Sequence, residues 1–324
     1  MHLQLNNSKI NSFTNVTITG SKSESNRLLL LKALFGSLEV QNISNSDDSQ
    51  YMLNALSTES GIVDIHHAGT AMRFLTAYFA TLKGRTTLLT GSQRMKERPI
   101  KVLVDALREL GADIEYVSQK GYPPLRIVGK RLLKKEVQMK ANVSSQYISA
   151  LLLIASKLEN GLTLHLDGKI TSAPYIRMTL SLLNQIGVET SFEAQTIRVK
   201  PNLENEPKIV NVESDWSSAS YFYSIIALSP IGTKVCLSTY KKNSLQGDSV
   251  LAEIYKDFGV ETVFDNNKIH LRRFQIPIPK SLILNLNNSP DIAQTIAVTC
   301  FGLGIGCHLT GLHTLKIKET DRLL

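Results

Sequence analysis

Four segments of this 324-residue chain share one pattern, in which small or polar residues open an apolar helix. The openings lie at Thr70, Ser144, Ser217 and Asp291, so successive openings are 74, 73 and 74 residues apart. Chance spacing of helices in an α/β protein does not easily produce three intervals that agree within one residue. The spacing therefore predicts a chain built from repeated units, each a supersecondary element that packs on its neighbours.

Each unit is expected to contain a second helix and several short strands. Glycine often ends a helix in the left-handed conformation, and the β-branched residues that follow favour a strand. Such stops lie at Gly111, Gly187 and Gly259, and further strands are predicted at 125–128, 162–166 and 269–271. We call the helix that opens a unit first-type and the helix that follows it second-type. Each can bury one apolar stripe against a sheet, which predicts an α/β fold.

The segment around Lys22 has the residues of an anion-binding helix start. Ser21 and Glu24 have the spacing of a capping box, so a helix is expected to begin there. Free backbone N–H groups, the hydroxyls of Ser21 and Ser23, and the cations Lys22 and Arg27 can together bind an anion. The alternative is a capped surface helix with solvated cations. The segment lacks the GxxxxGK[ST] spacing of a nucleotide-binding P-loop.

A second basic segment contains Arg94, Lys96 and Arg98 at alternate positions, followed by Pro99. In an extended chain these three cations share one side, and Pro99 suits the first turn of the next helix. The alternative is a solvated basic loop.

A third basic segment follows an apparent strand at 313–317. If this segment is helical, Lys318 and Arg322 stack one turn apart, with Glu319 one turn from Arg322. A carboxylate between two cations can transfer protons at a phosphate-bearing site. The alternative is an exposed face of ion pairs.

The polar residues that open the helices stand at equivalent positions in the repeat. Lys22, Thr70, Ser144, Ser217 and Asp291 all open first-type helices, so the N-termini of these helices can converge on one anionic ligand. The net charge of +8 also suits an anionic ligand. Asp291, next to a proline, has the simpler alternative of a helix N-cap.

The composition, 43% hydrophobic and 20% charged residues, is that of a globular protein. The polar N-terminus lacks the apolar core of a signal peptide, and the apolar stretch 297–309 is too short to span a membrane, so a cytoplasmic protein is expected. The histidines lack metal-ligand spacing, so no metal site is expected. Three cysteines, Cys236, Cys300 and Cys307, stand in apolar sequence surroundings and are predicted to be structural thiols rather than a disulfide framework.

Taken together, these segments resemble the enolpyruvyl transferase family, and within it the branch that acts on shikimate 3-phosphate. The matching motifs follow one another in order along nearly the whole chain. They lie at residues 20–27, 68–73, 89–99, 121–125, 144–146, 172–176, 217–221, 246–248, 290–291 and 318–322. Any one of them can arise by chance, whereas the ordered series is a specific signal.

The resemblance implies a two-domain enolpyruvyl transferase fold of repeated βαβαββ units, the last units being incomplete. Residues 20–214 would form an N-terminal-type domain of three units, and residues 1–19 with 215–324 an incomplete C-terminal-type domain. Six units of roughly 70 residues need about 420 residues, so roughly 90–100 are expected to be missing. The family places two more phosphoenolpyruvate-binding cations in that part, so a protein that ends at Leu324 is expected to be essentially inactive.

The resemblance also implies a reaction. The enolpyruvyl group of phosphoenolpyruvate is transferred to the 5-hydroxyl of shikimate 3-phosphate, and phosphate leaves through a tetrahedral intermediate, in the biosynthesis of chorismate and the aromatic amino acids. No cofactor is implied. A monomer with small-molecule substrates is expected, with neither nucleic acid nor membrane as a partner.

Site residues follow from the resemblance position by position. Shikimate 3-phosphate would contact Lys22, Ser23, Arg27, Ser144, Ser145, Gln146, Ser172, Tyr175, Asp291, Thr314 and Lys318. Phosphoenolpyruvate would contact Lys22, Gly69, Arg94, Gln146 and Arg322, and glyphosate, which mimics it, is expected to contact Gly69 and Arg94. Asp291 is the candidate base for the 5-hydroxyl, and Glu319 and Lys22 are candidates for the remaining proton transfers, a division that the sequence leaves open.

The chain departs from the family pattern at several positions. His67 stands where the family usually has Asn, Phe74 where it commonly has Pro, and Thr314 where an Asn contacts shikimate 3-phosphate. Ser214-Asp215-Trp216 replace Gly-Asp-Ala near an expected domain crossing.

Two alternative functions stay open. The first is the sister enzyme that acts on UDP-N-acetylglucosamine, whose members usually carry a reactive Cys on a loop where this chain has Arg94 and no cysteine nearby. The second is a non-enzymatic protein that binds nucleic acid or another anion, as the positive charge suggests. The 6% content of aromatic residues and the lack of an RNP-like or zinc motif disfavour it.

Overall fold

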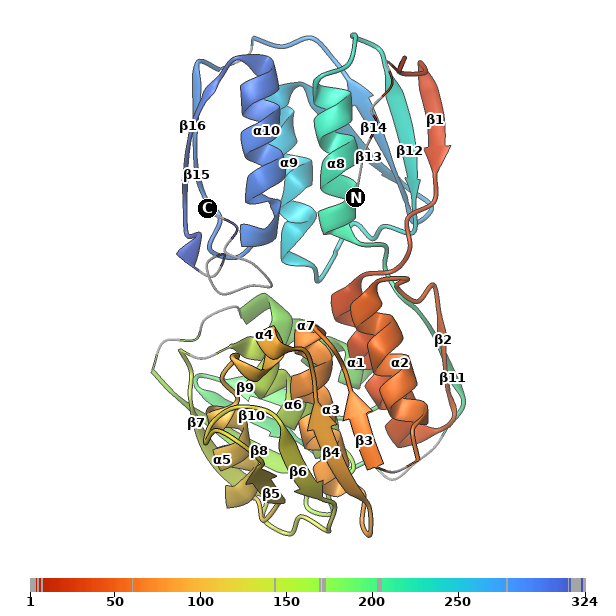
Figure 1. Ribbon diagram of the computed structural model, residues 1–324. Helices are drawn as coiled ribbons and strands as arrows, with labels where there is room; N and C mark the ends of the chain where they lie inside the picture. The colour runs from red at the N-terminus through yellow and green to blue at the C-terminus, as the bar shows by residue number, and fades with distance from the viewer. Residues whose placement is uncertain are drawn as a thin grey trace. The chain divides into compact units, whose positions relative to one another are not determined.

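The chain divides into two units, each described by itself (Figure 1). Thr19–Val212 form one, which we call the central unit, and Met1–Ile18 with Glu213–Leu324 form the other, the terminal unit. The computed structural model describes residues 4, 6, 8–59, 61–142, 144–168, 170, 173–202, 206–277, 279–313, 315 and 322.

Two sheets of the central unit have the same four-stranded order. In each, the first two strands are parallel, and the fourth strand lies antiparallel between the second and the third. One sheet has the order β3 (Gly61–Asp64), β4 (Thr86–Thr90), β6 (Leu125–Val128), β5 (Asp113–Tyr116). The other has the order β7 (Glu136–Lys140), β8 (Leu162–Asp167), β10 (Thr196–Val199), β9 (Thr190–Glu193). This shared topology confirms the predicted repeat.

Helices at matching positions connect these strands. The first-type helices are α3 (Gly69–Thr81) and α6 (Ser145–Ala155), and the second-type helices are α5 (Lys101–Glu109) and α7 (Ala173–Gln185). The predicted glycine stops after α5 and α7 are confirmed, since Gly111 and Gly187 have φ values of 107° and 91°. The rest of the unit contains α1 (Lys22–Phe35), α2 (Asp47–Ser57), the short α4 (Gln93–Lys96), and the parallel pair β2 (Leu38–Gln41) and β11 (Lys208–Asn211).

The terminal unit repeats the same strand order with a strand from the start of the chain. Its sheet has the order β1 (Phe13–Val16), β12 (Lys234–Ser238), β14 (Lys268–Arg273), β13 (Val260–Asp265), and Figure 1 shows β1 beside β12. The helices of this repeat are α8 (Trp216–Ala227) and α9 (Leu251–Ile254), the latter between the 3-10 turns η1 (Gly247–Val250) and η2 (Tyr255–Phe258). A parallel pair follows, β15 (Ser281–Asn285) and β16 (Gly306–Thr310), joined through η3 (Pro290–Ile292) and α10 (Ala293–Leu303).

The first-type helices of the central unit are buried on all sides, not along one stripe as predicted. Every residue of α3 from Gly69 to Ala80 is buried, and so is every residue of α6 except Gln146. The reason is that α3 packs against α1 and α6 as well as against β4 and β6. The single-stripe prediction is right for the second-type helix α5, which buries Leu103, Val104, Ala106 and Leu107.

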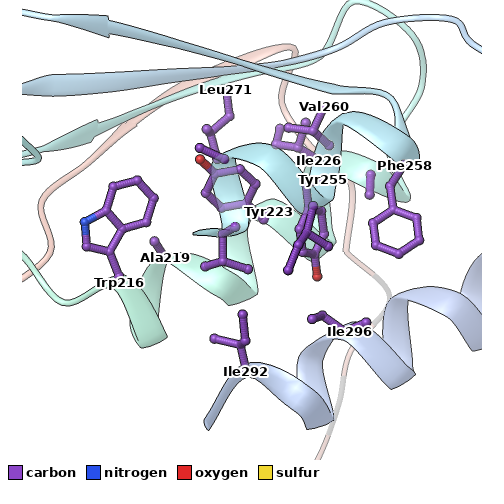
Figure 2. Packing of buried hydrophobic residues seen from close by; sticks show 14 of the residues in the cluster. Trp216, Ala219, Tyr223, Ile226, Tyr255, Phe258, Val260, Leu271, Ile292 and Ile296 are labelled. Carbon is purple, nitrogen blue, oxygen red and sulfur yellow. The ribbon is translucent and has the colours of Figure 1, made fainter. Parts of the chain in front are cut away.

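Aromatic side chains dominate the core of the terminal unit. Trp216, Tyr223, Tyr255 and Phe258 are each fully buried, and neighbouring rings lie 5.0–6.4 Å apart. Figure 2 shows these side chains between the sheet and α10. Ile296 of α10 lies on the side of them that faces away from the sheet. Ring contacts at these distances add to the stabilisation from apolar burial.

The helices α8 and α10 of the terminal unit also present apolar side chains to solvent. Tyr221 and Ile225 on α8 are 65% and 44% exposed, and Val298 and Phe301 on α10 are 61% and 88% exposed. In the terminal unit α8 packs against α10. In the central unit α1, α3 and α6 each pack against the other two.

The predicted strand at 313–317 is wrong for its described residues. His313 and Leu315 lie in a 3-10 turn, and the strand of this region is β16, which ends at Thr310. In the described part of the chain, no helix has the length and apolar character needed to cross a membrane.

Candidate functional site

The N-terminus of α1 carries Lys22 in an accessible position. A Cβ at Gly20 would lie 1.9 Å from the Asn42 carbonyl oxygen, so only glycine lets the chain enter α1 here. Lys22 Nζ lies 3.8 Å from Asp48 Oδ1, and its side chain is 39% exposed. Asp48, on α2, is nearly buried and holds the ammonium group at the start of α1, where a positive charge and the helix dipole both attract anions.

The predicted capping box is wrong. Ser21 does occupy the N-cap position of α1, but its side chain makes no capping hydrogen bond. Glu24 is 2% exposed, and its negative charge acts on Arg27 one turn further along the helix. The carboxylate therefore stabilises the positive charge of Arg27.

Arg27 is a buried cation that the protein itself surrounds with acceptors. Its Nε donates to Thr179 Oγ1 at 2.7 Å, Nη1 donates to Ser23 O at 2.7 Å, and Nη2 donates to Ser149 Oγ at 3.0 Å. The guanidinium also lies over the rings of Phe74 and Tyr175, at 5.3 and 5.9 Å. Burial lowers the pKa of Arg27 to about 10, which still leaves it charged at neutral pH.

The N-termini of α3 and α6 are tied together by a side-chain hydrogen bond. Gln146 Nε2 donates to Thr70 Oγ1 at 3.2 Å, and Ser144 Oγ caps α6 by accepting from Gln146 N at 3.4 Å. Ser145 is buried in the first turn of α6. The structure thus brings Gln146 of the predicted phosphoenolpyruvate site next to the residue that follows Gly69.

The basic segment after β4 is a short helix, so the predicted extended arrangement of its cations is wrong. Ser92 Oγ accepts from Met95 N at 3.3 Å and starts α4, so Arg94 and Lys96 lie on a helical turn, and Arg98 follows after its end. Arg94 is exposed and pairs with Glu97 at 3.1 Å. Arg98 instead lies against Gly69, where a Cβ would be 2.5 Å from its Nη1.

Arg73 fixes this segment against the first turn of α3. Its Nη1 donates to Gly69 O at 3.1 Å, and its Nη2 donates to Pro99 O at 3.1 Å. Tyr147 of α6 donates to the same Pro99 oxygen at 2.6 Å. Sequence reasoning assigned Arg73 no role beyond its place in a matching motif, and it assigned Arg98 only a place among three basic residues. Their importance arises from contacts across three segments.

In the terminal unit, two predicted site residues are in direct contact. Arg322 Nη1 donates to Asp291 Oδ1 at 3.0 Å, and Arg322 N donates to Leu315 O at 3.2 Å. Asp291 lies within the turn η3, and the N-cap positions of η3 and α10 are Ser289 and Ile292, so its alternative role as a simple N-cap is wrong. Arg322 lies in a turn rather than in the predicted helix. The predicted site residues Ser172, Thr314, Lys318 and Glu319 lie outside the described residues.

His67 belongs to a small cluster just before α3. The Nδ1 atoms of His66 and His67 are 2.8 Å apart, and His67 Nε2 lies 3.8 Å from Asp47 Oδ2. Tyr51 stacks on His66 at 5.7 Å. Among the residues that the structure describes, no group of three or more His, Cys, Asp or Glu side chains is placed to hold a metal ion.

The cysteines differ in exposure. Cys236 and Cys300 are buried, but Cys307 is exposed, so the prediction of apolar surroundings is wrong for Cys307. Burial raises the pKa of the Cys300 thiol to about 11, and the neighbouring Cys307 adds to the rise. At pH 8 only about one in a thousand such thiols is the reactive thiolate.

We therefore expect Ellman's reagent to react rapidly with one thiol of the native protein and slowly with the other two, until the protein is unfolded. A Cys307→Ser variant should lose the rapid phase, whereas Cys236→Ser should keep it. Three equal rates in the native protein would contradict the exposures described above.

The architecture is that of the two-domain enolpyruvyl transferases, which share its repeated βαβαββ sheets. One solved structure of EPSP synthase from Acinetobacter baumannii matches with a TM-score of 0.74 and 21% identity, covering 96% of this chain and 76% of that one. Another from the same organism matches with a TM-score of 0.60 and 17% identity, over 94% and 93% of the two chains. At these identities the matches establish the fold.

Sequence comparison gives the family. The model of the family described as EPSP synthase (3-phosphoshikimate 1-carboxyvinyltransferase) matches residues 57–324. The 3-phosphoshikimate 1-carboxyvinyltransferase of Bacteroides fragilis is 47% identical over 310 residues, which cover 95% of this chain and 75% of that protein. The enzyme of the same name from Haemophilus influenzae is 37% identical over 340 residues, covering 95% and 77%. The chain belongs to the EPSP synthase family, which decides against the UDP-N-acetylglucosamine branch and the nucleic-acid alternative.

Proposed function

We propose that this chain transfers the enolpyruvyl group from phosphoenolpyruvate to the 5-hydroxyl of shikimate 3-phosphate, with release of phosphate. The observation that carries the proposal is the hydrogen bond between Gln146 and Thr70, which joins the N-termini of α3 and α6. Helix N-termini and guanidinium groups bind phosphate and carboxylate, the two anionic groups that both substrates carry. Membership of the EPSP synthase family supports the same reaction.

Each binding role in this proposal follows the position that the resemblance assigns. Lys22, Ser23, Ser144, Ser145 and Gln146 of the central unit, with Arg27 and Tyr175, would bind shikimate 3-phosphate, while Lys22, Gly69, Arg94 and Gln146 would bind phosphoenolpyruvate. Asp291 would take the proton of the 5-hydroxyl, and Arg322, its ion-pair partner, would bind phosphoenolpyruvate next to it. Glu319 and Lys22 remain the candidates for the other proton transfers.

The domain assignment, the oligomeric state and the location are part of the same proposal. The central unit corresponds to the N-terminal-type domain, and the terminal unit to the C-terminal-type domain. The protein acts as a monomer in the cytoplasm.

The assay that tests the reaction measures phosphate release from phosphoenolpyruvate with an intact chain. Release is expected with shikimate 3-phosphate and not with UDP-N-acetylglucosamine. Release with the second acceptor alone would overturn the proposal. Calorimetric titration with shikimate 3-phosphate tests the binding step independently of turnover.

A Lys22→Ala variant should bind shikimate 3-phosphate about 10–100-fold more weakly, since a charge-assisted hydrogen bond contributes roughly 1.5–3 kcal/mol. Calorimetric titration measures the change. Lys101→Ala, which removes an exposed ammonium group paired with Asp105 on α5, is the matched control and should bind as the wild type does. Equal affinity in Lys22→Ala and wild type would remove Lys22 from the site.

A further inference from the structure

Arg98 is a cation next to the start of α3 that the roles proposed above leave unused. A Cβ on Gly69 would lie 2.5 Å from Arg98 Nη1, 2.8 Å from Nη2 and 2.9 Å from Cζ. Because the two terminal nitrogens are nearer than Cζ, the edge of the guanidinium group that carries Nη1 and Nη2 faces Gly69. Its N–H groups are thus next to the first turn of α3, whose N-cap, Ala68, has no side chain that can cap it.

The backbone holds Arg98 in this place. Arg98 N donates to Met95 O at 3.1 Å, and the oxygen of the next residue, Pro99, accepts from both Arg73 and Tyr147. Arg73 in turn holds Gly69 O, so the segment with Arg98 and the first turn of α3 are joined through one side chain. A binding group that is positioned before its ligand arrives loses little conformational entropy on binding.

Arg73 carries a second positive charge close to Arg98. Burial lowers the pKa of Arg73 to about 10, and the charge of Arg98 adds to the fall. Among the described residues, no carboxylate forms an ion pair with Arg73 or Arg98, and Glu97, adjacent in sequence, pairs with Arg94. Two guanidinium groups and a helix N-terminus together favour an anion at this point.

Arg94 offers a contrast within the same segment. Its side chain is 57% exposed and its Nη1 lies 3.1 Å from Glu97 Oε2, so it must leave a carboxylate before it can bind an anion. Arg98 needs no such rearrangement.

We propose that Arg98 binds an oxyanion group of phosphoenolpyruvate, its phosphate or its carboxylate, at the N-terminus of α3. This inference rests on the proposed function. It adds a binding residue to those that the motifs assign, one that can donate two parallel hydrogen bonds to the anion.

Calorimetric titration of phosphoenolpyruvate into protein saturated with shikimate 3-phosphate tests the proposal. Arg98→Gln is expected to weaken binding about 10–100-fold, the range for loss of a charge-assisted hydrogen bond. Arg98→Lys keeps the charge without the paired donors and should recover part of the loss. Arg126→Gln is the matched control and should bind as the wild type does. It removes a half-exposed guanidinium group on β6 that pairs with Glu115 on β5.

A merely structural role for Arg98 would lower the thermal midpoint and the affinity for shikimate 3-phosphate as well, so both are measured for each variant and are expected to stay unchanged. Wild-type affinity for phosphoenolpyruvate in Arg98→Gln would overturn the proposal and leave the proposed function intact. If Arg98→Gln does not fold, Arg98→Lys provides the test. Wild-type affinity for phosphoenolpyruvate in Arg98→Lys would overturn the proposal that Arg98 donates paired hydrogen bonds to the anion. No binding of phosphoenolpyruvate by the wild type would overturn the proposed function and this inference together.

Discussion

Replacing Trp216 by alanine is expected to lower the free energy of unfolding of the terminal unit by about 3–5 kcal/mol, the usual cost of deleting a buried aromatic side chain. Trp216 is fully buried, and its ring contacts those of Tyr223 and Tyr240 at 6.4 and 4.9 Å. Its Nε1 also donates to Glu213 Oε1 at 2.8 Å. The substitution therefore leaves a cavity and removes one hydrogen bond from a buried carboxylate.

Urea unfolding followed by far-UV circular dichroism measures this loss, because Trp216 is the only tryptophan and the variant has no tryptophan fluorescence. Hydrogen exchange of peptides from α8 and β14 places the loss in the terminal unit. Trp216→Phe keeps most of the packing and should cost less. Tyr221→Ala on the same helix, at a side chain 65% exposed, should change stability by less than about 1 kcal/mol. Equal losses in Trp216→Ala and Tyr221→Ala would contradict the core of Figure 2.

The repeat could be predicted from the sequence because its signals are local. Gly111, Gly187 and Gly259 each have positive φ after a second-type helix, a conformation that glycine adopts without strain. The strands that follow, β5, β9 and β13, are recognisable from a few adjacent residues. The near-constant spacing of the helix openings shows that these local signals recur along the chain. No single segment could establish that the chain is a repeat.

The cations after β4 show how a local pattern misleads. Alternation of Arg94, Lys96 and Arg98 has the period of a strand, but Ser92 precedes them and its hydroxyl caps Met95 N. A serine just before a helix is a start signal, and here the cap outweighs the alternation. The position of Arg98 against Gly69 depends in addition on Arg73, which lies on another helix.

The capping box and the strand at 313–317 failed for a related reason. Ser21 and Glu24 have the right spacing, but the Ser21 side chain makes no capping hydrogen bond, and the carboxylate of Glu24 is buried near Arg27. His313 and Leu315 have the residue types of a strand, but β16 already pairs with β15 and ends at Thr310. Tertiary contacts decide both cases, and a single sequence does not contain them.

Replacing Arg27 by methionine is expected to destabilise the central unit by about 3–5 kcal/mol, the range for removing one partner of a buried charged group. The variant removes the donor to Thr179 Oγ1 and one of the two donors to Ser149 Oγ, and it leaves Glu24 buried without the nearby positive charge. Methionine keeps much of the side-chain volume, so the expected loss comes from the polar contacts rather than from a cavity. Urea unfolding with hydrogen exchange of peptides from α1 and α7 measures it.

Lys32→Met is the matched control, because Lys32 is exposed on the same helix, and its expected change is less than about 0.5 kcal/mol. The resemblance assigns Arg27 to shikimate 3-phosphate, whereas three of its hydrogen bonds already go to the protein. If Arg27 acted only as a ligand for the substrate, Arg27→Met would unfold at the same urea concentration as the wild type and lose affinity alone. A loss of stability in the absence of substrate, absent from Lys32→Met, would instead show that the buried guanidinium first holds α1 to α6 and α7, and that any substrate contact is added to a cation already fixed by the fold.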